Sequence, residues 1–257
     1  MAPLRRTPHV SAMIWDEVVH RLKGGATAIL PIGSGSKQHG WHMPMGVDQF
    51  QAEWFASRIS EWTDALIWPT LTYGAYPTFV AYPGSLSLSE ATFETLVREI
   101  VSGLADSGAR SILILNVGHT TIEGVARAVA GLNTNAAIRQ VSLSQGEHFR
   151  EMVRKHARQA YGSHADEVET SVVLAIAPYL VEMERAEASR PLPDGPQHGP
   201  LTPHDKQSPN FTASGSFGDP RLASADKGRI FVEAILRDLK EATITSMCPP
   251  CPPSFGV

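Results

Sequence analysis

The sequence predicts one α/β domain with a largely parallel sheet flanked by helices. Two apolar runs, residues 26–33 and 111–119, each end in a turn that contains glycine, as buried strands often do. Segments with apolar residues at helical spacing separate such runs, and strands that alternate with helices form parallel sheets. The 257 residues are 42% hydrophobic, which suffices for the core of one large domain or two small ones. No internal repeat divides the chain, so a single domain is expected.

The expected elements follow in chain order. The first helix covers residues 13–23, where apolar residues recur at helical spacing before a Gly-Gly pair ends it. Ser89 is the expected N-cap of a helix that runs to about Ser107, because its hydroxyl can accept a hydrogen bond from a free backbone N–H. The remaining helices are expected at 49–62, 121–132, 147–160, 166–181 and 224–241, strands at 26–33, 65–74, 111–119 and 138–144, and a long ordered loop at 187–220.

Residues 1–245 are assigned to this domain, and residues 246–257 to a tail rich in Pro and Cys. The tail is expected to be disordered, because its prolines interrupt helices and sheets. Both cysteines, Cys248 and Cys251, lie in it. Their spacing is that of half a zinc site or of a redox pair, but no second half is present, so an inert tail is favoured.

Charge and hydropathy argue against a nucleic-acid-binding or membrane-spanning protein. The net charge is −4 and no basic stripe is visible, which argues against a nucleic-acid partner. No run reaches the eighteen or so apolar residues of a membrane span, and no apolar segment follows the two N-terminal arginines as in a signal peptide. A body without cysteine is typical of the reducing cytoplasm. We therefore expect a cytoplasmic protein that binds neither nucleic acid nor membranes.

The first polar cluster, His39-x-x-His42 followed by Asp48, comes directly after the first predicted strand. Imidazole and carboxylate ligands suit Zn²⁺, Mn²⁺ or Fe²⁺. A glycine-rich loop allows His39 and Asp48 to converge on one ion. The alternative is a surface loop with incidental histidines, and the pattern alone does not separate the two.

Two further clusters complete the candidate site. His119 follows the strand at 111–119, at the carboxyl edge where ligands of such folds bind, although a lone His in a turn is more often structural. His164, Asp166, Glu167 and Glu169 precede an apolar helix, where burial is costly unless they are paired or bind metal. An acidic helix N-terminus that interacts with the helix dipole is the common alternative. Glu169 is the strongest candidate, because the apolar residues begin at Val172.

Together the clusters resemble the creatininase (creatinine amidohydrolase) family. The segment LPIGSGSKQHGWHMPMGVD is similar to that family's strand-and-loop motif, and TYGAYPTFVAYPGSLSLSEATF to its Pro-Gly-Thr-Leu-Ser segment. ILILNVGHTT corresponds to its Asn-Gly-His turn, and HADEVETSVVLAIAPYLV to its His-Ala-Gly-Glu-x-Glu-Thr-Ser motif. ASGSFGDPRLASADKG matches a late motif that ends in Lys-Gly. These matches occur in order over roughly residues 25–240.

The resemblance implies a metal-dependent hydrolase of small amides outside peptides, with one or two divalent ions (Zn, Mn or Fe). Family members open cyclic amides, remove formyl groups or mature small peptide-derived cofactors, and many form hexamers. Carried over by motif, His39 and Asp48 are metal ligands, and Asp48 bridges if two ions bind. His119 is a ligand to one ion, and His164 matches the family's catalytic histidine. Glu169 is a further ligand or orients one.

The chain departs from the family pattern at Lys37, which stands where the family has a metal-binding Glu two residues before the His. The first loop is one residue longer, and the second turn contains an extra Val117. Thr121 replaces a second acidic ligand. At an effective dielectric of about 20, an ammonium beside a dication is repelled by several kcal/mol. Therefore either Lys37 points away, or it is neutral or carbamylated, or one ion site is lost.

Three functions are compatible with this sequence. The first is a metal-dependent amidohydrolase that acts on a small cyclic or non-peptide amide through a metal-activated water. The second is a repurposed enzyme for cyclisation, condensation or isomerisation in a specialised biosynthetic pathway, with Lys37 as base or Schiff-base nucleophile. The third is a non-catalytic binding or assembly subunit, which the retained His and acidic residues disfavour.

Overall fold

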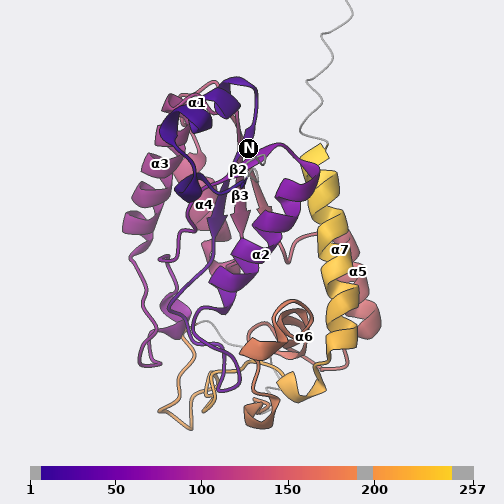
Figure 1. Ribbon diagram of the computed structural model, residues 1–257. Helices are drawn as coiled ribbons and strands as arrows, with labels where there is room; N and C mark the ends of the chain where they lie inside the picture. The colour runs from indigo at the N-terminus through magenta and orange to yellow at the C-terminus, as the bar shows by residue number, and fades with distance from the viewer. Residues whose placement is uncertain (1–6, 190–198, 245–257) are drawn as a thin grey trace, which may run out of the picture.

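A four-stranded parallel sheet forms the centre of the molecule (Figure 1). The structure, a computed structural model, describes residues 7–189 and 199–244. The strands lie in the order β2-β1-β3-β4, and the central pair aligns Ala28 with Ile112. They are β1 (Thr27–Ile32), β2 (Ala65–Ile67), β3 (Ser111–Asn116) and β4 (Ala137–Ser142). The predicted α/β fold with a parallel sheet is confirmed.

Helices cover both faces of the sheet, and two apolar clusters fill the spaces between the layers (Figure 1). Successive strand residues point to opposite faces, so Leu30 joins one cluster and Ile29 the other. The first cluster packs against α1 (Trp15–Lys23), α3 (Glu90–Asp106) and α4 (Ile122–Val129), and the second against α2 (Val47–Trp62), α5 (Glu147–His156), α6 (Glu167–Ile176) and α7 (Ala225–Ile244).

Helices α6 and α7 approach each other closely at Gly228. A Cβ atom on this glycine would lie 1.8 Å from the backbone oxygen of Ser171 in α6. No residue other than glycine fits there without moving one helix. Lys227, the preceding residue, is ion-paired with the fully buried Glu167 of α6. The late Lys-Gly motif therefore fixes α6 against α7.

Short 3-10 helices connect the main elements. They are Val10–Ala12, Pro77–Phe79, His119–Thr121, Pro178–Leu180, Met183–Arg185 and Pro220–Leu222. The helix His119–Thr121 follows β3, and Pro77–Phe79 lies beside the site described below.

Several predicted boundaries differ from the structure. The strand predicted at 65–74 ends at Ile67, shortly before Pro69, which has no N–H for a sheet ladder. Helix α5 ends at His156 instead of residue 160, because the N–H groups of Arg158 and Gln159 donate to the Glu167 carboxylate, at 2.7 Å each. The predicted cap is confirmed, since the Ser89 hydroxyl accepts a hydrogen bond from the backbone N–H of Thr92.

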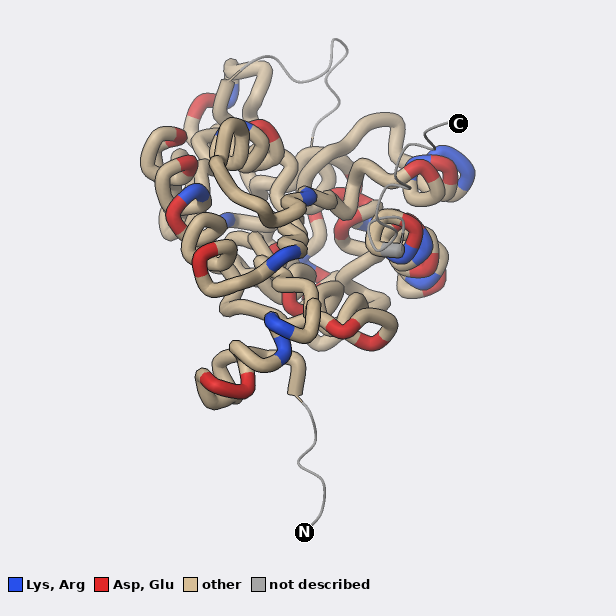
Figure 2. Tube along the Cα trace, turned by 90° about the horizontal axis from the view of Figure 1, so that it is seen from above, with Lys and Arg blue, Asp and Glu red and all other residues tan. Residues whose placement is uncertain are grey.

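The predicted tail at 246–257, with Cys248 and Cys251, lies outside the described residues, as does the 190–198 part of the predicted loop. In the described part of the chain, no helix is both long and apolar enough to cross a bilayer. Figure 2 shows acidic and basic positions interspersed around the rim of the molecule.

Candidate active site

Two stretches that are far apart in the sequence, 37–48 and 164–169, meet beyond the carboxyl ends of β1 and β3. The loop after β1 carries Lys37 and His39, and Asp48 lies in the first turn of α2. His164 precedes α6, and Glu169 lies in its first turn. This edge is the usual ligand site of parallel α/β folds.

Asp48 is the most highly connected carboxylate of this cluster. It is 1% exposed, and its two oxygens face two different groups. Oδ2 lies 2.7 Å from the Nζ of Lys37, and Oδ1 lies 2.9 Å from the Nε2 of His39. The Nδ1 of His39 lies 2.8 Å from the backbone oxygen of Lys37. Because a carbonyl only accepts, Nδ1 is the protonated nitrogen, and the lysine backbone orients the ring.

His164 is held in the same way on the opposite side. Its Nε2 donates to the backbone oxygen of Gln38 at 2.8 Å, which leaves Nδ1 facing Glu169 Oε2 at 3.7 Å. The rings of His39 and His164 lie 5.0 Å apart. Glu169 Oε1 is 3.7 Å from the Nε2 of His39, so this carboxylate contacts both imidazoles.

The start of α6 sets the position of Glu169. Asp166 caps the helix, accepting from the N–H groups of Val168 and Glu169 at 2.9 Å each. Ala165 adopts a left-handed conformation, with φ 45°, and its N–H donates to Glu169 Oε2 at 2.6 Å. A non-glycine residue with positive φ is unfavourable unless its surroundings impose it. Of the acidic residues predicted here, Asp166 and Glu167 are structural, and Glu169 faces the cluster.

The surroundings lower the pKa values of Asp48 and His164, for different reasons. Burial alone would raise the pKa of the Asp48 carboxyl, but the Lys37 ammonium and the His39 ring outweigh burial and hold it well below its usual range. Burial, reinforced by the charges of Lys37 and His39, lowers the pKa of His164 well below 6.5. His164 is therefore a neutral imidazole at neutral pH, with a free electron pair on Nδ1.

The donor set fits a cation. Because Nδ1 of His39 donates to the backbone, its Nε2 is left to face Asp48 Oδ1 at 2.9 Å, and Nδ1 of His164 is left to face Glu169 Oε2 at 3.7 Å. Two acceptors in contact repel each other unless a proton or metal ion lies between them. Imidazole ligands of metals commonly donate their other N–H to a backbone carbonyl. His39, His164 and Glu169 each have a ligand atom within 4.8 Å of the others. Separations of 2.9–3.7 Å suit ligands whose bonds to one ion are about 2.1 Å long.

His119 lies apart from this group. It lines the same cavity but is exposed, at the start of the 3-10 helix after β3. Asn116 holds this turn by accepting from the N–H of Gly118 and from the hydroxyl of Thr121, at 3.2 and 2.9 Å. Thr121, at the position of an acidic family ligand, is thus a structural residue. The ligand role of His119 stays a prediction.

Sequence reasoning missed two residues of this site. Gln38 supports His164 through its backbone oxygen, and its side chain donates to the backbone of Gly215 at 3.0 Å. A backbone contact leaves no side-chain signal in the sequence. Phe79 packs on the His164 ring, with centroids 4.4 Å apart, and its face lies 5.0 Å from the Lys37 ammonium. Among apolar residues near prolines, nothing distinguishes it beforehand.

A cavity of about 520 Å³ opens over the cluster and is bordered by Lys37, Asp48, His164 and Glu169. Aromatic and aliphatic side chains form much of its remaining wall, among them Phe79, Phe149, Leu201 and Phe217. A small substrate with an apolar part would fit this space beside the polar groups.

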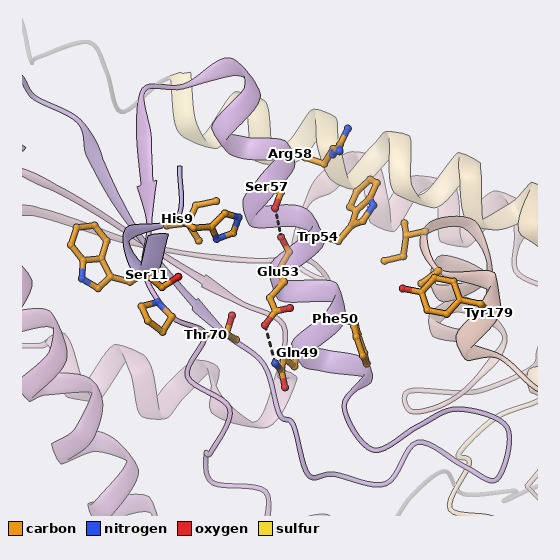
Figure 3. Close-up of a pocket in the computed structure, with 15 residues that line it drawn as sticks. His9, Ser11, Gln49, Phe50, Glu53, Trp54, Ser57, Arg58, Thr70 and Tyr179 are labelled. Carbon is orange, nitrogen blue, oxygen red and sulfur yellow. Dashed lines mark hydrogen bonds between the residues drawn. The ribbon is translucent and has the colours of Figure 1, made fainter. Parts of the chain in front are cut away.

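A second cavity, of about 720 Å³, lies on the outer side of α2 (Figure 3). Glu53 and Trp54 of α2 and Tyr179 line it, and Gln49 donates to Glu53 across 2.9 Å. None of the clustered His, Lys or acidic residues described above borders it. Its walls assemble no comparable set of ionisable groups, so the first cavity is the candidate active site.

Comparison with known proteins identifies the family of the chain. The family model for creatininase, described as creatinine amidohydrolase, matches residues 11–243. The chain therefore belongs to the creatininase family, as the motifs predicted. The creatinine amidohydrolase of Pseudomonas putida is 27% identical over 262 residues, covering 93% of this chain and 97% of the relative.

Other relatives are named for different reactions. The 3-dehydro-scyllo-inosose hydrolase of Thermotoga maritima is 26% identical over 94% of this chain and 86% of its own. The mycofactocin precursor peptide peptidase of Mycolicibacterium smegmatis is 29% identical over 80% of each chain. A solved structure described as creatininase with Mn has a TM-score of 0.79 at 24% identity, covering 95% of this chain and 100% of that one. A creatininase variant of Zn-Zn type gives the same values. These structures share the fold.

Proposed function

We propose that the chain is a metal-dependent amidohydrolase that cleaves a small cyclic or non-peptide amide with a metal-activated water. One observation carries the proposal: two imidazoles, each tied by one nitrogen to a backbone carbonyl, turn their other nitrogen toward the carboxylates of Asp48 and Glu169. The relatives named as hydrolases and the neighbours named for Mn or Zn add support.

In this proposal His39, Asp48 and Glu169 would hold the ion. A bound divalent ion would lower the pKa of water and polarise the amide carbonyl. His164 would accept a proton at Nδ1 from the attacking water and deliver it to the leaving nitrogen. Burial lowers the pKa of His164, so the ring is neutral before the reaction and its Nδ1 can take up a proton. Phe79 keeps the ring in place.

The substrate class rests on the cavity. Its volume of about 520 Å³ and its largely apolar wall suit a compact amide with an apolar part. The mycobacterial relatives named as peptidases leave a small peptide as the competing class. Comparing the hydrolysis of cyclic ureides and lactams with that of short peptides distinguishes the two.

The test is metal content after purification, measured by mass spectrometry, together with sensitivity to chelators. Wild-type protein is expected to retain Zn, Mn or Fe, and His39→Ala to lose it. His119→Ala examines the predicted ligand role of His119, and undiminished metal content in this variant would exclude that role. A wild-type chain without stoichiometric metal would refute the proposal.

The second candidate is the lysine-dependent reaction, which the burial of Lys37 beside the cavity favours. Its nitrogen faces the Asp48 oxygen at 2.7 Å, so it serves as the charged partner of a carboxylate before it can act as an amine nucleophile. Trapping of a Lys37 adduct by borohydride, in the presence of a carbonyl substrate, would support this reaction over hydrolysis. A non-catalytic subunit would show neither turnover nor trapping.

We also propose a cytoplasmic homo-oligomer that serves a biosynthetic pathway, with the hexamer as the expected assembly. Exposed aromatic side chains beside the second cavity, Phe50 and Tyr179 (Figure 3), are of the kind that interfaces bury. Light scattering coupled to size exclusion measures the assembly directly.

A further inference from the structure

The two oxygens of the Asp48 carboxylate face two different groups. On the Oδ2 side is the Lys37 ammonium, and on the Oδ1 side is the His39 nitrogen that belongs to the proposed metal centre. The carboxylate is buried, so solvent does not balance its charge. Each oxygen therefore depends on one specific partner.

The ammonium is fixed at its position. Lys37 is 6% exposed, and its Nζ lies 5.0 Å from the centroid of the Phe79 ring and 5.7 Å from that of Tyr76. The faces of aromatic rings attract cations, so the carboxylate and both rings stabilise the charge together. The lysine side chain reaches into the cluster and does not turn to solvent.

We infer that the Lys37 ammonium occupies the position of a second cation, so that the chain binds one divalent ion, on the His39 side of Asp48. The inference rests on the proposed function and specifies the number of ions at that site. An ammonium and a dication on one buried carboxylate oxygen would repel each other strongly, because the interior screens charge poorly. Oδ2 is thus closed to metal, while Oδ1 remains available.

With Lys37 paired to Asp48, the site needs fewer acidic ligands than a site with two dications would. A second dication would require further carboxylates to balance its charge, yet this chain has Lys37 and Thr121 at two positions where the resemblance implies acidic ligands. The Lys37 ammonium carries only one positive charge, and its contact with one oxygen of the Asp48 carboxylate is enough to balance that charge.

The experiment counts ions in purified, full-length protein that has been stripped and reloaded with Mn²⁺ or Zn²⁺. Wild type is expected to bind one equivalent per chain, and Mn²⁺-loaded protein to give the electron paramagnetic resonance spectrum of an isolated ion. Lys37→Glu is expected to bind two equivalents, with a magnetically coupled Mn²⁺ pair. Lys37→Met, which removes the charge without adding a ligand, is expected to keep one.

A charge reversal away from the site provides the control. Lys155→Glu changes an exposed lysine of α5 and is expected to leave the count at one. Two ions in wild type would overturn the inference and leave the metal centre intact, whereas none would refute the metal centre itself. A count of one in both wild type and a folded Lys37→Glu would also overturn it, because removal of the ammonium would then not open the second position.

Discussion

Replacing Gly228 by alanine tests whether the close approach of α6 and α7 positions the site. The added Cβ would lie 1.8 Å from the Ser171 oxygen and 2.8 Å from the Cβ of Ala175. Non-bonded contacts of this kind need at least about 3 Å, so the helices must separate by about 1 Å or more. Overpacking typically costs about 1–3 kcal/mol. A change of about 2 kcal/mol shifts the Tm of a protein of this size by about 4–8 °C.

Gly103→Ala is the matched control. Gly103 lies on the exposed side of α3, and a Cβ there would have no atom within 4 Å. Alanine is favoured over glycine in helices by about 0.5–1 kcal/mol, so this variant should raise the Tm by about 1–4 °C. Differential scanning calorimetry measures both, and the metal content of Gly228→Ala reports any displacement of Glu169. If the two variants changed the Tm in the same direction, the packing argument would be wrong.

Two further perturbations address the same helix. Lys227→Met leaves the buried Glu167 without its charged partner, so we expect a loss of about 3 kcal/mol in urea unfolding, against less than about 0.5 kcal/mol for Arg229→Met, whose ion pair is exposed. Equal losses of unfolding free energy in the two variants would show that the buried ion pair stabilises the fold no more than the exposed one. Burial raises the pKa of the Asp166 carboxyl from 3.8 to about 6. The folded state therefore holds the carboxyl proton up to a higher pH than the unfolded state does. As a result, the free energy of unfolding falls as the pH rises from 3.8 to about 6. Asp166→Asn should therefore gain up to roughly 3 kcal/mol relative to wild type between pH 4 and pH 7, on top of a constant offset from the lost Gln159 contact. A pH-independent difference would contradict the assignment.

The sequence was sufficient to predict the order of the elements, because β1 and β3 are continuous apolar runs and α3 between them has a clear apolar face. It also identified Lys37, His39, Asp48, His164 and Glu169, which the structure brings together. Their chemical types are visible without coordinates, as are their positions, either after a strand or at the start of an apolar helix. Family membership followed from the same motifs.

Other features depended on contacts between distant residues. The end of α5 is set by Glu167, which follows it in sequence and takes two of its N–H groups. The ion pair between Lys37 and Asp48 arises because the loop after β1 folds back onto the first turn of α2. His119 fits a ligand pattern, yet the extra Val117 lengthens its turn, and the residue lies on the cavity rim. Such outcomes depend on loop geometry, which residue types alone do not specify.

The dependence of α6 on α7 has a consequence for biosynthesis of the enzyme. Glu167 obtains its counter-charge from Lys227, sixty positions later, so a nascent chain carries an unbalanced acidic group at the start of α6 until α7 has left the ribosome. Fragments that lack α7 are therefore expected not to retain the proposed metal ion, even in metal-rich medium.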